Sequence, residues 1–192
     1  MSRNMKLIVC ALALTLCTGY ALAATAPPAD TLKVDYFSNA NTGDPDGTLR
    51  ITNAGTSGGS LCAAIYVFDP MQELSECCSC LVSPNGLRTL SVDTDLTKNP
   101  LTGGTKLSTG SIRIVSTTES GGSCPLPYQG RVTPTAGVRS WTTHIQSASA
   151  ITETASQDAT LSAAELAQLE RGCYAIALDG SGSGVCSCGT GD

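Results

Sequence analysis

The most chemically distinctive residues of this 192-residue chain are its ten cysteines, five of which fall into two tight clusters. The first cluster is Cys77-Cys78-Ser79-Cys80 and the second is Cys186-Ser187-Cys188. Eight cysteines lie beyond residue 23, and an even number of thiols in an exported chain of this size is typical of a disulfide framework. If the thiols stay reduced, the same clusters could bind a soft metal ion through thiolate sulfurs.

Disulfide formation is the interpretation that compartment and cysteine number favour. A bridge between the adjacent residues Cys77 and Cys78 would be strained, so we expect them to have different partners. Cys186 and Cys188 point the same way if their segment is a strand, and both can then reach one neighbouring element. We therefore expect the Cys77–Cys80 loop to be bridged to Cys186 and Cys188. The full set of disulfide candidates is Cys62, Cys77, Cys78, Cys80, Cys124, Cys173, Cys186 and Cys188.

The alternative is a metal site whose ligands are Cys77, Cys78, Cys80, Cys186 and Cys188. Zinc sites more often show two regular C-x₂-C pairs, frequently with histidine, and only Cys77 to Cys80 has that spacing. Oxidation after export competes for the thiols, so metal binding is the second hypothesis and no cofactor is predicted. The same spacing matches a redox C-x-x-C motif, but the βαβ setting of such motifs is missing from the predicted elements.

The other reactive side chains do not predict catalysis. His144 is the only histidine, and the alternation from Trp141 places it on the polar face of a strand, as an exposed residue. No serine lies in a G-x-S-x-G motif. Asp69, Glu73 and Glu76 are interpreted as solvated loop acids rather than a glycosidase pair. We therefore expect no catalytic residues and a protein that is not an enzyme.

Asn39, Asn41, Asp44 and Asp46 form an oxygen-rich segment that could hold calcium. Their spacing lacks the Gly at position 6 and the Glu at position 12 of an EF-hand loop. Ordinary turn chemistry is the competing interpretation, because Asp44-Pro45-Asp46-Gly47 fits a β-turn. Calcium binding is therefore the weaker hypothesis for this segment.

The N-terminal residues predict export. Residues 1–23 have positive charge, the apolar run Leu7–Leu16 and the small-x-small site Ala21-Leu22-Ala23, as a signal peptide does. The run is shorter than the roughly 20 residues that a membrane span needs. Residues 24–31 are then a flexible leader and residues 32–192 a single domain, located outside the cell or in the periplasm.

The charge of the chain argues against two classes of partner. Cleavage after residue 23 removes Arg3 and Lys6 and leaves nine Lys and Arg against 16 Asp and Glu, a net charge of −7. An acidic chain with few aromatic residues does not suit nucleic acid or anionic lipid. Cys17 offers a lipoprotein alternative, but Leu16 stands where the residue before a lipidated cysteine is small.

Composition and patterning predict a mainly β protein, because the chain beyond residue 31 is dense in Thr, Ser and Gly and alternates apolar with polar residues. Two turns, at residues 44–47 and 83–86, separate some of these segments. A disulfide-stapled β-sandwich of about eight short strands fits this pattern best. The predicted strands are residues 32–36, 48–52, 61–68, 87–92, 111–116, 141–146, 174–178 and 185–188.

One helix is expected near the C-terminus. Ser162 is a helix N-cap with Glu165 three residues later, which is the capping-box pattern. Ala163–Arg171 are mostly helix-forming residues, and Gly172 stands where a left-handed C-cap belongs. The sequence therefore predicts a helix of about nine residues followed by a strand.

Four motifs occur in a distinctive order: L-C-A-A-I-Y-V-F-D, E-C-C-S-C, P-N-G-L-R-T-L-S-V and V-C-S-C-G-T-G. In these motifs and their order, the chain resembles a group of uncharacterised exported bacterial proteins with an ECCSC motif and a C-terminal CSCG motif. The resemblance runs from about Thr48 to Gly189. It implies secretion and carries no activity, ligand or site residue to this chain.

These observations together predict a secreted, non-enzymatic structural or interaction protein, such as a self-assembling filament, matrix or adhesive subunit. The physical basis for this prediction is a disulfide-stapled β domain whose leader or first strand could add to the open sheet edge of a neighbouring copy. The expected partners are a further copy of the chain or a cell-surface molecule. The alternative function is extracellular metal binding by the cysteine clusters.

Overall fold

The fold is described by a computed structural model that covers residues 28–39, 45–99, 107–128, 130, 132–179 and 184–189. The predicted signal peptide, residues 1–23, and the first part of the leader lie outside these residues. The elements, in chain order, are β1 (Leu32–Asn39), β2 (Thr48–Asn53), β3 (Leu61–Phe68), β4 (Leu74–Val82), β5 (Leu87–Ser91), the π-helical turn η1 (Val92–Leu96), β6 (Thr109–Thr118), β7 (Val138–Ser147), β8 (Ala150–Ala155), β9 (Gln157–Ala159) and α2 (Ala163–Asp179).

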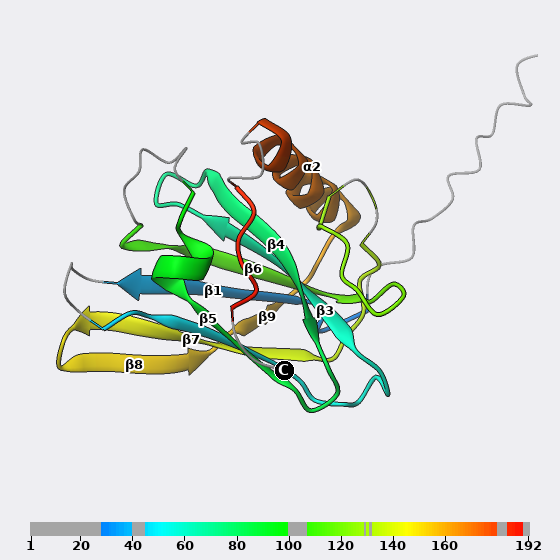
Figure 1. The fold of residues 1–192 in the computed structure, drawn as a ribbon, viewed down its shortest axis with the longest axis horizontal. Helices are drawn as coiled ribbons and strands as arrows, with labels where there is room; N and C mark the ends of the chain where they lie inside the picture. The colour runs from blue at the N-terminus through cyan, green and yellow to red at the C-terminus, as the bar shows by residue number, and fades with distance from the viewer. Residues whose placement is uncertain are drawn as a thin grey trace, which may run out of the picture.

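The nine strands of the described residues belong to one strongly curved sheet (Figure 1). Its order is β4-β3-β6-β1-β7-β2-β5, with β8 paired to β7 and β9 paired to β1. The sheet is nearly closed and barrel-like, so its two halves face each other across one core. The predicted mainly β fold with disulfide staples and one helix near the C-terminus is therefore confirmed.

The two ends of the sheet, β4 and β5, are neighbours in the chain and define a seam in the barrel. The predicted turn at residues 83–86 connects them: Gly86 N donates to Ser83 O, and Asn85 has a φ of 61°. Positive φ is a conformation that asparagine tolerates better than most residues, which explains its place in this turn. Across the seam, Arg88 Nε donates to Leu81 O at 2.9 Å.

Strand β3 is the most apolar run because both of its faces are covered. One face, with Ala63, Ile65 and Val67, points into the barrel core. The other face, with Ala64 and Tyr66, belongs to a second apolar cluster beneath α2. A strand that is buried on both sides has no reason to alternate apolar with polar residues.

The helix begins as predicted and ends later than predicted. Ser162 Oγ accepts the N–H of Glu165 at 3.0 Å, which confirms the N-cap. The helix then continues to Asp179, so the predicted C-cap at Gly172 and the predicted strand 174–178 are wrong. Gly172 instead allows close packing, because a Cβ there would lie 2.9 Å from Leu74 Cδ2 of β4. In the part of the chain that the structure describes, no helix is long and apolar enough to span a membrane.

Candidate functional site

Residues 184–189 lie beside β4 and occupy the seam of the barrel (Figure 1). Val185 forms a parallel bridge with Cys77, supported by hydrogen bonds from Cys77 N to Gly184 O and from Cys186 N to Cys77 O. On the other side of the seam, a Cβ on Gly189 would lie 2.3 Å from Thr89 O of β5. We call residues 184–189 the seam segment, and it replaces the strand that was predicted at 185–188.

The eight described cysteines form four disulfides. The pairs are Cys62–Cys124, Cys77–Cys173, Cys78–Cys186 and Cys80–Cys188. Two of these connect the first cysteine cluster to the seam segment, which is the connection that the sequence led us to expect. The adjacent residues Cys77 and Cys78 have different partners, also as expected.

The alternation of β4 explains which cysteine reaches which partner. Cys78 and Cys80 are two residues apart and share the face that points into the barrel core. Cys77 lies on the opposite face, beneath α2, where Cys173 is its partner. The cluster of three cysteines is therefore divided between two layers of the protein, and only two of the three face the seam segment.

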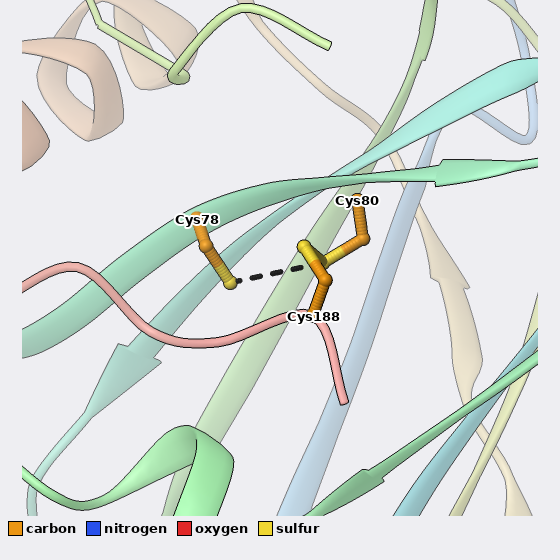
Figure 2. A group of neighbouring side chains, drawn as sticks. All are labelled: Cys78, Cys80 and Cys188. Atoms are coloured by element: carbon orange, nitrogen blue, oxygen red, sulfur yellow. Dashed lines mark hydrogen bonds between the residues drawn. A yellow bond between two sulfur atoms is a disulfide. The ribbon is translucent and has the colours of Figure 1, made fainter. Parts of the chain in front are cut away.

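The disulfides Cys78–Cys186 and Cys80–Cys188 are neighbours. Figure 2 shows the sulfur atoms of Cys78, Cys80 and Cys188 pointing toward one another. The Sγ atoms of Cys78 and Cys80 are 4.0 Å apart, and those of Cys78, Cys80 and Cys188 all lie within 4.8 Å of one another. Cys78, Cys80 and Cys186 are buried and Cys188 is partly buried. We call this arrangement of Cys78, Cys80, Cys186 and Cys188 the disulfide ladder.

A polar contact between Asp95 and Ser187 fixes the middle of the seam segment. Ser187 N donates to Asp95 O at 3.1 Å, and the Ser187 hydroxyl donates to the Asp95 carboxylate. The other carboxylate oxygen of Asp95 accepts the N–H of Ser91 at 2.8 Å. The turn η1 thereby connects the end of β5 to the segment between the two ladder cysteines Cys186 and Cys188.

Glu76 lies on β4 two residues before Cys78 and is fully buried, so the prediction of a solvated acid is wrong. Burial raises the pKa of Glu76 to about 7. The backbone N–H groups of Asn99 and Lys98 and the positive charge of Lys98 lower this pKa, and the negative charge of Asp95 raises it. The alternation of β4 was the signal that could have revealed this, since Glu76 shares the inward face of Cys78 and Cys80. Asp69 and Glu73 are turn residues: Asp69 Oδ1 accepts the N–H of Glu73 at 2.8 Å.

His144 is buried, so its predicted exposure is wrong as well. Its ring stacks on Tyr36 with 3.9 Å between centroids, and its Nε2 lies 2.6 Å from Thr154 Oγ1 of β8. A carboxylate oxygen, Asp35 Oδ1, also approaches Nε2, at 3.8 Å. A hydrolytic triad needs the acid on the other ring nitrogen, so this geometry does not match that mechanism.

The calcium candidate falls partly outside the described residues, because Asn41 and Asp44 are not among them. Asn39 and Asp46 do lie close together, but Asn39 presents its nitrogen to Asp46 Oδ1 at 3.1 Å. The Asn39 oxygen accepts the N–H of Gly47 at 2.9 Å. These contacts fix the turn before β2, which is the turn chemistry that competed with calcium binding in the sequence.

A pocket of about 560 Å³ lies between α2 and the neighbouring sheet residues Phe68, Leu74 and Arg113. Arg113 and Glu165 form an ion pair on its wall, and the Arg113 guanidinium lies 5.3 Å from the centre of the Phe68 ring. Gln72 and Gln168 supply further polar groups. The charges that line the pocket are therefore already paired.

No protein-family model, curated protein sequence or solved structure matches the chain.

Proposed function

We propose that the protein is an exported, non-enzymatic structural or interaction protein that associates with further copies of itself through the open edge of β8. Four disulfides in the described residues suit an oxidising extracellular or periplasmic location. Their loops span 62 to 108 residues, so they connect distant parts of the chain. Such bridges restrict the unfolded chain and thereby stabilise the folded domain, which is useful in an exposed subunit.

The observation that carries the proposal is the exposure of β8. All six of its residues are exposed, and among the described strands it pairs with β7 alone. A strand in this position presents a row of unpaired backbone N–H and C=O groups, which is a template for another strand. Ile151 adds an apolar side chain that is 47% exposed.

The other strands offer less to a partner. The seam segment covers the outer edge of β4. Strand β1 lies in the middle of the sheet between β6 and β7, so it cannot serve as the donated strand that the sequence suggested. Strand β9 also pairs with a single described strand, β1, but it has three residues against six in β8, so β8 is the strand we assign to self-association.

A second copy of β8 suits this edge. In a twofold antiparallel pair with Thr152 opposite Thr152 of the partner, each Glu153 lies opposite Ile151 rather than opposite the other Glu153. Each Glu153 already pairs with Arg50 of its own chain, so like charges do not meet. The pair would be symmetric, as most soluble homodimers are.

The test is the oligomeric state of the oxidised protein, measured by analytical ultracentrifugation over a range of concentrations. We expect reversible association, weakened more than about tenfold by the double substitution Ile151→Lys/Thr152→Lys, because edge lysines oppose strand pairing. A matched control is Met71→Lys/Leu178→Lys, which adds the same charge at exposed apolar residues away from β8. A monomer at every concentration, or equal weakening by both double variants, would refute the proposal.

A further inference from the structure

We infer that the disulfide ladder, when reduced, is a four-thiolate site for Zn²⁺ whose ligands are Cys78, Cys80, Cys186 and Cys188. The oxidised and the zinc-bound forms then use the same four residues as alternative ways of holding the seam segment against β4, independently of self-association through β8.

The sulfur positions already approach those of a tetrahedral zinc site. Zinc binds thiolate sulfur at about 2.3 Å, so tetrahedral geometry places the sulfurs about 3.8 Å apart. The Sγ atoms of Cys78 and Cys80 are 4.0 Å apart, and that of Cys188 lies within 4.8 Å of both (Figure 2). The fourth sulfur, from Cys186, is bonded to that of Cys78.

The two halves of the ladder are matched dithiol arms. Cys78-Ser79-Cys80 and Cys186-Ser187-Cys188 have the same spacing and lie on parallel segments, so each presents two sulfurs to the other. Cys77 is excluded from the site, because it lies on the opposite face of β4 and bridges to Cys173 of α2. The donor set is therefore four sulfurs, the number that structural zinc sites use.

Zinc binding requires the sulfurs of each pair to separate from bonding distance to about 3.8 Å, a change of roughly 2 Å. We assign this movement to the seam segment, which lies outside the paired strands of the sheet. Two backbone hydrogen bonds connect it to Cys77 of β4, and the Asp95–Ser187 contact holds its middle. The core side of the site is rigid by comparison, since Cys78 and Cys80 belong to the paired strand β4.

The chemistry balances with a thiol or phosphine reductant. Reduction of the two ladder disulfides takes four electrons and four protons and yields four thiols. Zn²⁺ then replaces the four thiol protons, which leave to solvent, and forms four zinc–sulfur bonds. Four thiolates complete the tetrahedral coordination of Zn²⁺ and leave no position for water, so the site is structural rather than catalytic.

The experiment compares zinc binding by the full chain before and after anaerobic reduction. After gel filtration, we expect one zinc per reduced chain and none on the oxidised chain, by elemental mass spectrometry. X-ray absorption of the zinc complex should show four sulfur neighbours at about 2.3 Å. Both the zinc content and the absorption spectrum are measured on the unsubstituted protein, so they do not depend on the folding of a variant.

Two double variants locate the site. Cys186→Ser/Cys188→Ser should weaken zinc binding by more than about 100-fold, because it removes half of the ligands. Cys62→Ser/Cys124→Ser removes the same number of thiols elsewhere and should leave the affinity unchanged, with circular dichroism as the check on folding. Absence of zinc from the reduced chain, nitrogen or oxygen neighbours in the absorption spectrum, or equal affinity of the two variants would each overturn the assignment.

Discussion

Glu76 Oε1 accepts the backbone N–H of Asn99 at 2.5 Å inside the protein, two residues before Cys78 of the disulfide ladder. The side chain of Asn99 donates in turn to Ser75 O at 2.6 Å, so the segment after η1 is held against β4 through buried polar groups. The carboxyl group is the ionisable part of this contact, and its burial makes the contact sensitive to pH.

Stability should decrease as the pH rises towards 7. Burial raises the pKa of Glu76 from an ordinary value near 4.5 to about 7, so between these values the folded chain binds more protons than the unfolded chain. The free energy of unfolding therefore falls across this range, by at most about 3 kcal/mol. Urea denaturation at pH 5 and pH 8 measures the fall. Glu76→Gln should abolish most of it, whereas Glu73→Gln, at an exposed residue, should leave it unchanged.

Removal of the two ladder disulfides should be non-additive. With Cys77–Cys173 intact, either ladder disulfide alone closes a loop of about 15 residues between α2 and the seam segment. Removal of one ladder disulfide therefore leaves this loop closed, and removal of both opens it. Loop entropy then predicts a cost of about 2 kcal/mol for Cys78→Ala/Cys186→Ala or for Cys80→Ala/Cys188→Ala, and about 5 kcal/mol for all four substitutions. Guanidinium denaturation of the three variants gives these costs. If the variant with all four substitutions lost only the sum of the free energies lost by the two double variants, the shared loop would be contradicted.

Gly189→Ala should dislodge the seam segment. Gly189 has a φ of 61°, and its added Cβ would lie 2.3 Å from Thr89 O, a backbone atom that cannot move aside. Gly58→Ala is the matched control, since Gly58 has a φ of 73° and no atom within 4 Å of an added Cβ. The control should cost about 1 kcal/mol through backbone strain alone, and Gly189→Ala at least about 2 kcal/mol. Similar losses of unfolding free energy in the two variants would show that contact with β5 is unimportant.

Local patterns predicted the elements that depend on local chemistry. Leu49 and Ile51 alternate with polar residues and are both buried in β2, and Ser162 starts the helix. The cysteine spacing led to the expected connection between the first cluster and the seam segment, because every second residue of a strand shares a face.

Long-range burial is what the sequence did not reveal. Lys33 alternates like a solvent-facing residue, yet it is buried because Asp158 of β9 and Asp30 form ion pairs with it. His144 is covered by Tyr36, from a strand more than 100 residues earlier. The helix extends past Gly172 because Cys173 is bonded to Cys77 of β4 and lies with it in the apolar cluster between α2 and the sheet. Each outcome depends on a neighbour that is distant in the chain, which no local pattern contains.

The parallel pairing of the seam segment with β4 has a consequence for biogenesis. A polypeptide is made from its N-terminus, so Cys77, Cys78 and Cys80 emerge about 100 residues before the cysteines they finally bond. During that interval the three thiols are closer to one another in the chain than to any correct partner. In an oxidising compartment they are therefore exposed to premature bonding among themselves. Correct maturation should consequently depend on an isomerase that reshuffles such bonds, or on a delay of oxidation until the seam segment arrives.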